Sequence, residues 1–176
     1  MRLSSRDGVV RFVRIAVPLV VLLFARGARA EQVIIRLPGE HPRYSFEAEP
    51  HVLLGWRELG DGPGVGFRGT IPIVHNGFVS RINNSVGIGF GLDMDPVRHA
   101  DHFAMPIVMQ WNFWLSTHWS VFGEPGAAIL FGQGRGGAKP VLPIVHVGGR
   151  LHFSEAVALT MRVGYPDIAV GISFFL

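Results

Sequence analysis

The chain of 176 residues suits one domain, and 48% of its residues are hydrophobic. It contains no cysteine, so disulfides cannot stabilise the fold. The formal charge of +3 is misleading, because residues 1–30 hold six of the 16 Lys and Arg and one of the 13 Asp and Glu. The remaining 10 basic and 12 acidic residues argue against nucleic-acid binding through a basic surface.

Residues 1–30 are predicted to be a signal peptide. Four arginines precede the apolar run "IAVPLVVLLFA" from Ile15 to Ala25, and "ARA" provides small residues for cleavage after Ala30. The run is shorter than the ~20 apolar residues of a transmembrane helix, and Pro18 interrupts it. Residues 31–42 follow as a mixed segment with turn residues, which we interpret as a periplasmic N-terminal lead-in.

From Arg43 onward, eight segments alternate apolar and polar residues with the period of a β-strand, and turn-rich stretches separate them. The expected strands are 43–57, 63–74, 84–92, 102–116, 118–131, 141–153, 156–164 and 167–176. No helical period interrupts this pattern. The sequence therefore predicts an all-β domain over residues 43–176, an eight-stranded antiparallel up-and-down transmembrane β-barrel.

One face of these segments carries no charged residue, because alternate residues of a strand share a face. The opposite face carries the polar and charged residues Glu47, Glu49, His51, Arg57, Arg68, His102, Gln110, Asn112, Glu124, His146, Arg150, His152 and Arg162. A soluble lipocalin-like carrier is an alternative. Small residues on the polar face, such as Gly87, Gly89 and Gly91, favour a crowded lumen, and aromatic residues cluster toward the ends of the apolar face.

The topology places connections 75–83, 117 and 154–155 on the periplasmic side, and 58–62, 93–101, 132–140 and 165–166 outside. The first, "HNGFVSRIN", is long for a periplasmic turn. Five prolines fall inside expected strands: Pro50, Pro72, Pro106, Pro125 and Pro143. A closed barrel has no edge strand, so we expect each proline at a bulge or near a rim.

The closing segment "AVGISFFL" ends the chain on alternating apolar residues. With the signal peptide and eight alternating segments, the chain resembles the small eight-stranded outer-membrane barrels of Gram-negative bacteria, of the OmpX and OmpA-barrel type. Gly171, Phe174 and Leu176 fit the spacing of that family's C-terminal assembly signal, although Ala169 stands where a polar residue is usual. The resemblance implies that the barrel-assembly machinery recognises this strand.

The lumen-facing charges are the main candidate site. Glu47, Glu49 and His51 follow one another on one face and could be read as an acid/base group. We favour a structural network, because an eight-stranded barrel has a filled interior and buried charges need partners. The expected lumen network contains Glu47, Glu49, His51, Arg68, Glu124, Arg150 and Arg162.

Three other motifs have ordinary explanations. "HFS" at His152 to Ser154 is similar to the His-x-Ser pair of outer-membrane lipid A deacylases, but the topology places it at a periplasmic turn. "DMDPVRHADH" at 93–102 could offer metal ligands but lacks a calcium-loop spacing, so we interpret it as a solvated loop. "GQGRGGAKP" at 132–140 is read as a flexible surface loop.

The expected function is therefore a small, non-enzymatic outer-membrane barrel with a plugged polar lumen, in a structural or surface-interaction role. No catalytic residue, metal or cofactor is predicted. The expected partners are outer-membrane lipid and the barrel-assembly machinery, without nucleic acid, and the sequence does not identify a partner of the surface loops. A lipid-modifying enzyme and a soluble periplasmic carrier are the alternatives.

Overall fold

The computed structural model describes residues 32–54, 63–95, 99–131 and 141–176, with only the backbone of Asp95 and of residues 99–102. Its strands are β1 (Glu47–Leu54), β2 (Gly64–Val74), β3 (Asn84–Asp95), β4 (His99–Trp114), β5 (Trp119–Phe131), β6 (Val141–His152), β7 (Val157–Tyr165) and β8 (Ile168–Phe175). The predicted signal peptide, the loop 132–140 and Arg57 lie outside the described residues.

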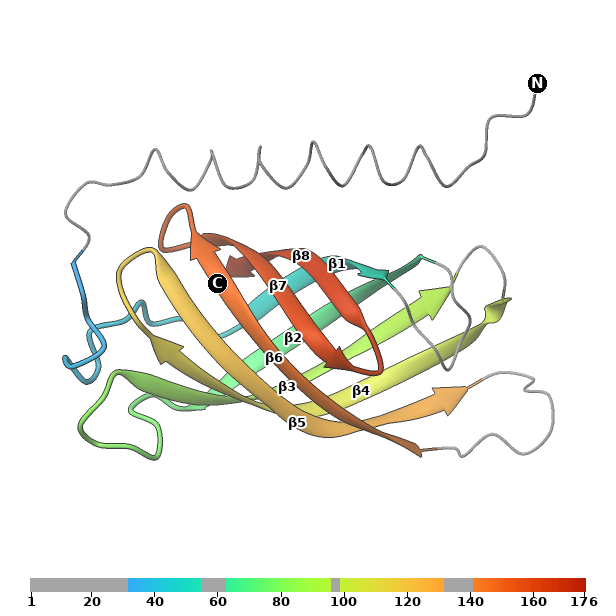
Figure 1. Ribbon diagram of the computed structural model, residues 1–176, viewed down its shortest axis with the longest axis horizontal. Helices are drawn as coiled ribbons and strands as arrows, with labels where there is room; N and C mark the ends of the chain where they lie inside the picture. Colours follow the sequence, from blue (N-terminus) through green and yellow to red (C-terminus); the bar gives the residue numbers. More distant parts are fainter. Residues whose placement is uncertain (1–31, 55–62, 96–98, 132–140) are drawn as a thin grey trace, which may run out of the picture. The chain divides into compact units, whose positions relative to one another are not determined.

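The eight strands close into one barrel in which each strand pairs with its neighbours in sequence (Figure 1). All pairings are antiparallel, and β1 closes the barrel against β8. The prediction of an all-β, eight-stranded up-and-down barrel is confirmed. In the part of the chain that the structure describes, no helix is long and apolar enough to cross a membrane.

The two faces of the barrel wall differ as the alternation indicates. Glu47 and Glu49 are each 1% exposed and Arg150 is fully buried, whereas Val145 and Val147 are each 59% exposed. Charged side chains thus fill the interior, and the outer wall is apolar. This is the reverse of the distribution in a soluble protein, where charged residues are rarely buried unless they are paired.

Two of the five prolines lie where we expected them, at a bulge or near the end of a ladder. Pro72 lies at a bulge, because the β2–β3 register shifts between Pro72 and Val74. Pro143 lies beyond the β6–β7 ladder, which begins at Val145.

The remaining three prolines lie inside strands, contrary to the expectation that each would lie at a bulge or rim. At Pro50 the β1–β8 register passes from Ala48 directly to His51. The β3–β4 register skips Pro106 and the β4–β5 register skips Pro125 in the same way. Each proline keeps its pairing on the other side, so the missing N–H donor interrupts the ladder with one neighbour only.

Strand boundaries also differ from the prediction around residues 93–101. β3 extends to Asp95 and β4 begins at His99, so most of the expected outer loop is strand. The segment is rich in Asp and His, a composition that is typical of a solvated loop. The sequence composition alone does not distinguish an aspartate that faces the lumen from one that faces water. The first strand is shorter than predicted at its start, because β1 begins at Glu47 and not at Arg43.

Candidate functional site

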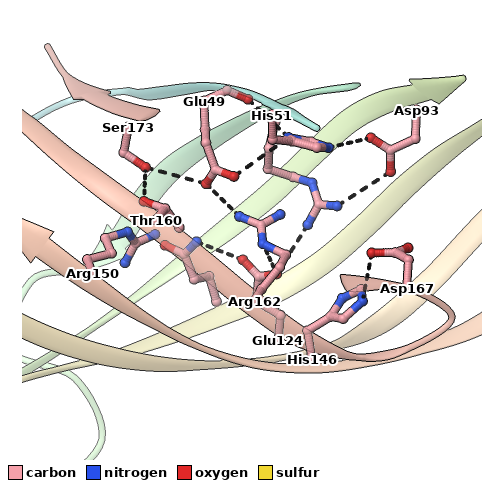
Figure 2. Close-up of polar contacts among 12 residues, drawn as sticks. Glu49, His51, Asp93, Glu124, His146, Arg150, Thr160, Arg162, Asp167 and Ser173 are labelled. Atoms are coloured by element: carbon pink, nitrogen blue, oxygen red, sulfur yellow. Dashed lines mark hydrogen bonds and ion pairs between the residues drawn. The ribbon is translucent and has the colours of Figure 1, made fainter. Parts of the chain in front are cut away.

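The middle of the lumen is filled by paired charges from strands on all sides of the barrel (Figure 2). Arg150 on β6 places Nη2 2.7 Å from Oε1 of Glu47 on β1, and its Nη1 donates to Asn112 Oδ1 at 2.6 Å. The same guanidinium lies 4.3 Å from the ring centroid of Phe122. Ser173 donates to Glu47 Oε1 at 2.7 Å, so this carboxylate has partners from two other strands.

A second group of charges adjoins the first. Arg162 Nη2 donates to Glu49 Oε2 at 2.5 Å, and its Nε lies 3.7 Å from Glu124 Oε2. Glu124 also accepts from Arg68 at 3.2 Å and from Gln110 at 2.8 Å. Because each carboxylate contacts an arginine and is at most 1% exposed, the electrostatic attraction acts in a medium of low dielectric constant.

His51 extends the network toward the end of the barrel where β1 ends and β2 begins. Its Nε2 lies 2.9 Å from Asp93 Oδ1, and its Nδ1 lies 3.6 Å from Glu49 Oε1. Both cross-strand neighbours of His51 are glycines, Gly66 on β2 and Gly171 on β8. A Cβ atom at Gly66 would lie 2.1 Å from Asp93 Oδ1, so the glycine provides the space that the His51–Asp93 pair occupies.

Asp93 corrects the interpretation of residues 93–102 as a solvated loop. It is 3% exposed and also faces Arg68 at 3.6 Å. A second pair that sequence reasoning missed is His146 with Asp167, whose Nε2 and Oδ1 are 3.4 Å apart. The sequence carries a signal for Asp93: continuing the β3 alternation beyond Leu92 puts residue 93 on the lumen face.

The structure brings all seven residues of the expected lumen network into ion pairs or hydrogen bonds with one another or with Asp93. The carboxylates of Glu47 and Glu49 are each held by an arginine. Both carboxylates are buried, each 1% exposed. The arrangement can cross-link the strands and fill the lumen.

An apolar cluster occupies the lumen toward the end of the barrel where β1 ends. Its members come from five strands and are each at most 3% exposed: Leu53, Ala104, Val108, Ala128, Ile144 and Ala169. Charged side chains also lie beside this cluster, since Asp93 is the cross-strand partner of Ala104 and Asp167 lies two residues before Ala169.

Stacked rings occupy the end of the barrel where β1 begins. The Trp114 ring lies between His41 and His152, at centroid distances of 5.2 Å and 5.0 Å, and His152 stacks on Phe175 at 5.4 Å. Tyr44 contacts Phe175 edge-on at 4.9 Å. His41 and Tyr44 precede β1, so the segment before the first strand takes part in covering this end.

Residues of the N-terminal lead-in are fixed to the barrel by main-chain hydrogen bonds. Ile34 N donates to Leu115 O at 3.0 Å, and Asn83 N donates to Ile35 O at 2.7 Å. The His41 ring lies parallel to Trp114, at 8°, and its Nδ1 is 2.6 Å from Asn83 Oδ1. Burial lowers the pKa of His41, and the positive charges of His75 and Arg43 lower it further, although the hydrogen bond with Asn83 acts in the opposite direction.

The docked lead-in should therefore loosen in acid. An undocked His41 binds a proton near its ordinary pKa of about 6.5, and the docked one binds it less readily. Docking is then favoured above that pH and weakens as the pH falls through it. Because the chain lacks cysteine, reactivity of Ile34→Cys, at a position 4% exposed, can be compared with that of Val33→Cys, at one 68% exposed.

We expect the ratio of the two labelling rates, Ile34→Cys over Val33→Cys, to rise between about pH 7.5 and about pH 5. Taking the ratio removes the pH dependence of the thiol itself. The rise should disappear in His41→Gln, which cannot titrate. An unchanged ratio in the parent chain would contradict a His41-dependent docking.

The His152–Ser154 pair is not assembled. His152 Nε2 lies 2.9 Å from Ser120 Oγ inside the barrel, whereas Ser154 Oγ accepts from Ala156 N at an exposed turn. Within the described residues, no group of three or more His, Asp or Glu is placed to hold a metal ion. The side chains of His99, Asp101 and His102 lie outside that description.

No family model and no curated protein matches the chain. Among solved structures, one described as "De novo design of transmembrane beta-barrels" matches with a TM-score of 0.53 and 12% identity, over 77% of this chain and 99% of its own. The NMR structure of the de novo designed protein TMB2.3 covers 78% of this chain and 97% of its own, with a TM-score of 0.49 and 10% identity. The first likeness supports a small eight-stranded barrel fold, and not the OmpX and OmpA-barrel type in particular.

Proposed function

We propose that the chain is a small, non-enzymatic outer-membrane barrel with a structural or surface-interaction role. The observation that supports this most strongly is the reversed distribution of side chains. Arg150 and Glu124 are fully buried inside the barrel, while Val145, Val147 and Val163 on the outer wall are each more than half exposed. In water the outer wall would cost about 25 cal/mol per Å² of apolar surface, a cost that lipid removes.

Fractionation of cells that express the full chain tests this location. We expect a processed product in the sarcosyl-insoluble envelope, with a heat-modifiable mobility in gel electrophoresis. A soluble periplasmic product, as the carrier alternative requires, would overturn the proposal.

The plugged lumen is a second part of the proposal. Its support is the pairing of Arg68, Arg150 and Arg162 with carboxylates in an eight-stranded barrel, whose interior is just wide enough for side chains. We expect no steady conductance from the purified protein in planar bilayers. A steady ion-selective conductance would replace the plugged barrel with a channel.

For assembly, we propose that the barrel-assembly machinery recognises β8 through Gly171, Phe174 and Leu176. Phe174 and Leu176 lie on the outer wall, 41% and 68% exposed, and Gly171 lies on the lumen face. Deleting residues 174–176 should prevent insertion while export continues. Normal insertion of that truncated chain would contradict the proposal.

The lipid-modifying alternative has no comparable support, because His152 contacts Ser120 and not Ser154. Mass spectrometry of lipid A from expressing cells separates the two functions. We expect unchanged lipid A, and a change in its acyl composition that depends on Ser154 would favour the enzyme.

A further inference from the structure

The long connection between β2 and β3, residues 75–83, is fastened to the outer wall of the barrel. Asn84, the first residue of β3, donates from Nδ2 to Val79 O at 2.7 Å and to Ile82 O at 2.8 Å. Its Oδ1 accepts from Trp111 Nε1 at 3.0 Å. Trp111 lies on the outward face of β4, so Asn84 joins the loop to that face, and Asn84 itself is only 1% exposed.

The fastened loop presents apolar side chains beside the apolar wall. Phe78 is 63% exposed and Val79 is 37% exposed. The Phe78 ring packs edge-on against Trp111 at 5.6 Å, and Trp111 packs against Phe113 at 4.9 Å. The loop therefore continues the apolar outer wall beyond the strands, and we call Phe78, Val79, Trp111 and Phe113 the loop patch.

Polar groups border the loop patch. Ser80 and Arg81 follow Val79 and are exposed, and the Trp111 N–H is satisfied by Asn84. Aromatic side chains of membrane barrels are enriched where acyl chains meet headgroups. The acyl core would reject the exposed Arg81, and water would leave Phe78 unfavourably exposed. At the boundary between the acyl core and water, Phe78 can contact acyl chains while Arg81 remains hydrated.

We infer that the loop patch binds the headgroup–acyl boundary of a phospholipid leaflet and fixes the depth of the barrel at this end. The inference rests on the proposed function, since it needs a barrel in a membrane. The inference predicts a specific contact: the loop 75–83 lies in the interface, whereas residues 154–156 in the turn at the same end lie in water.

Depth-dependent quenching of a fluorophore tests the contact. Single cysteines at Phe78, Glu155 and Val147 are labelled with NBD in the full chain, folded in phosphatidylcholine vesicles that carry a spin label either near the headgroup or near the acyl-chain end. We expect the shallow spin label to quench position 78 more than the deep one. The deep label should quench position 147, and neither should quench position 155.

The outcomes separate the inference from the proposed function. If position 78 behaves like position 155 while position 147 is quenched, the loop lies in water and the inference is wrong. If position 147 is also unquenched, the proposed membrane barrel fails. If position 78 is blue-shifted but unquenched, and the shift disappears on dilution, a second copy and not lipid covers the patch, which also overturns the inference.

A second variant tests the fastening. Asn84→Ala in the Phe78→Cys background removes three hydrogen bonds to the main chain of Val79 and Ile82 and one to Trp111, and we expect the shallow quenching to fall. Asn76→Ala, an exposed asparagine of the same loop, is the matched control and should leave the quenching unchanged. Heat-modifiable mobility shows that each variant is folded. Undiminished quenching in folded Asn84→Ala would contradict the role assigned to Asn84.

Discussion

Replacing Arg162 with alanine should lower the free energy of unfolding of the barrel by about 3–5 kcal/mol, because removing one partner of a buried ion pair leaves the other charge uncompensated. Arg162 is 2% exposed, and its guanidinium contacts Glu49 at 2.5 Å and Glu124 at 3.7 Å. Alanine leaves Glu49 without its arginine in a crowded lumen. Urea unfolding of the folded chain in micelles, followed by tryptophan fluorescence, measures the change.

Arg81→Ala is the control, since Arg81 is exposed on the loop 75–83. A surface substitution of this kind should change the free energy of unfolding by no more than about 0.5 kcal/mol. The double variant Arg162→Ala/Glu49→Gln should recover part of the loss, because the uncompensated charge is also removed. Equal stability of Arg162→Ala and Arg81→Ala would mean that water reaches the network and that the lumen is not packed.

Replacing Gly148 with alanine should destabilise the barrel by about 1–3 kcal/mol through overpacking. Gly148 lies on the lumen face of β6, between Phe122 on β5 and Arg162 on β7. An added Cβ would lie 2.2 Å from Phe122 Cζ and 2.6 Å from Met161 O. The Phe122 ring would have to move, and this would disturb its contact with the Arg150 guanidinium, which lies 4.3 Å from the ring centroid.

The next residue supplies the matched control. Gly149 faces outward, and an added Cβ would meet nothing closer than Ser120 O at 3.8 Å. Gly149→Ala should therefore be neutral or stabilising by up to about 1 kcal/mol, because alanine loses less backbone freedom than glycine in a strand. Equal free energies of unfolding for the two variants would contradict the assignment of residue 148 to a filled lumen.

Alternation with period two was sufficient to predict the fold and most of the lumen network. Glu47, Glu49 and His51 occupy alternate positions of one strand, and this parity places them inside the barrel whatever the exact strand ends are. The three arginines follow from the same parity, since charges of opposite sign share that face. The pairing itself, such as Arg150 with Glu47, depends on barrel closure and strand register, which periodicity does not specify.

The residues that sequence reasoning missed lie where composition and parity conflict. Asp93 belongs to a segment rich in Asp and His, which is typical of a loop, but parity continues through it and directs Asp93 inward. Asn84 shows the opposite case, a polar residue on the outward face that becomes buried because the loop 75–83 hydrogen-bonds to it. Extending the alternation would have found Asp93, whereas the burial of Asn84 depends on contacts with the loop that a period-two pattern does not describe.

In a membrane barrel, the apolar outer wall contacts lipid on every side. Small spin labels on cysteines at Phe67, Ile107 and Val147, on β2, β4 and β6, test this directly by their collision rates with oxygen and with a water-soluble nickel complex in vesicles. We expect oxygen to collide with the label more often than the nickel complex does at all three positions, and we expect the reverse order at Glu155→Cys. Frequent collisions with the nickel complex at all three wall positions would show that the wall faces water and that the barrel does not lie in a membrane.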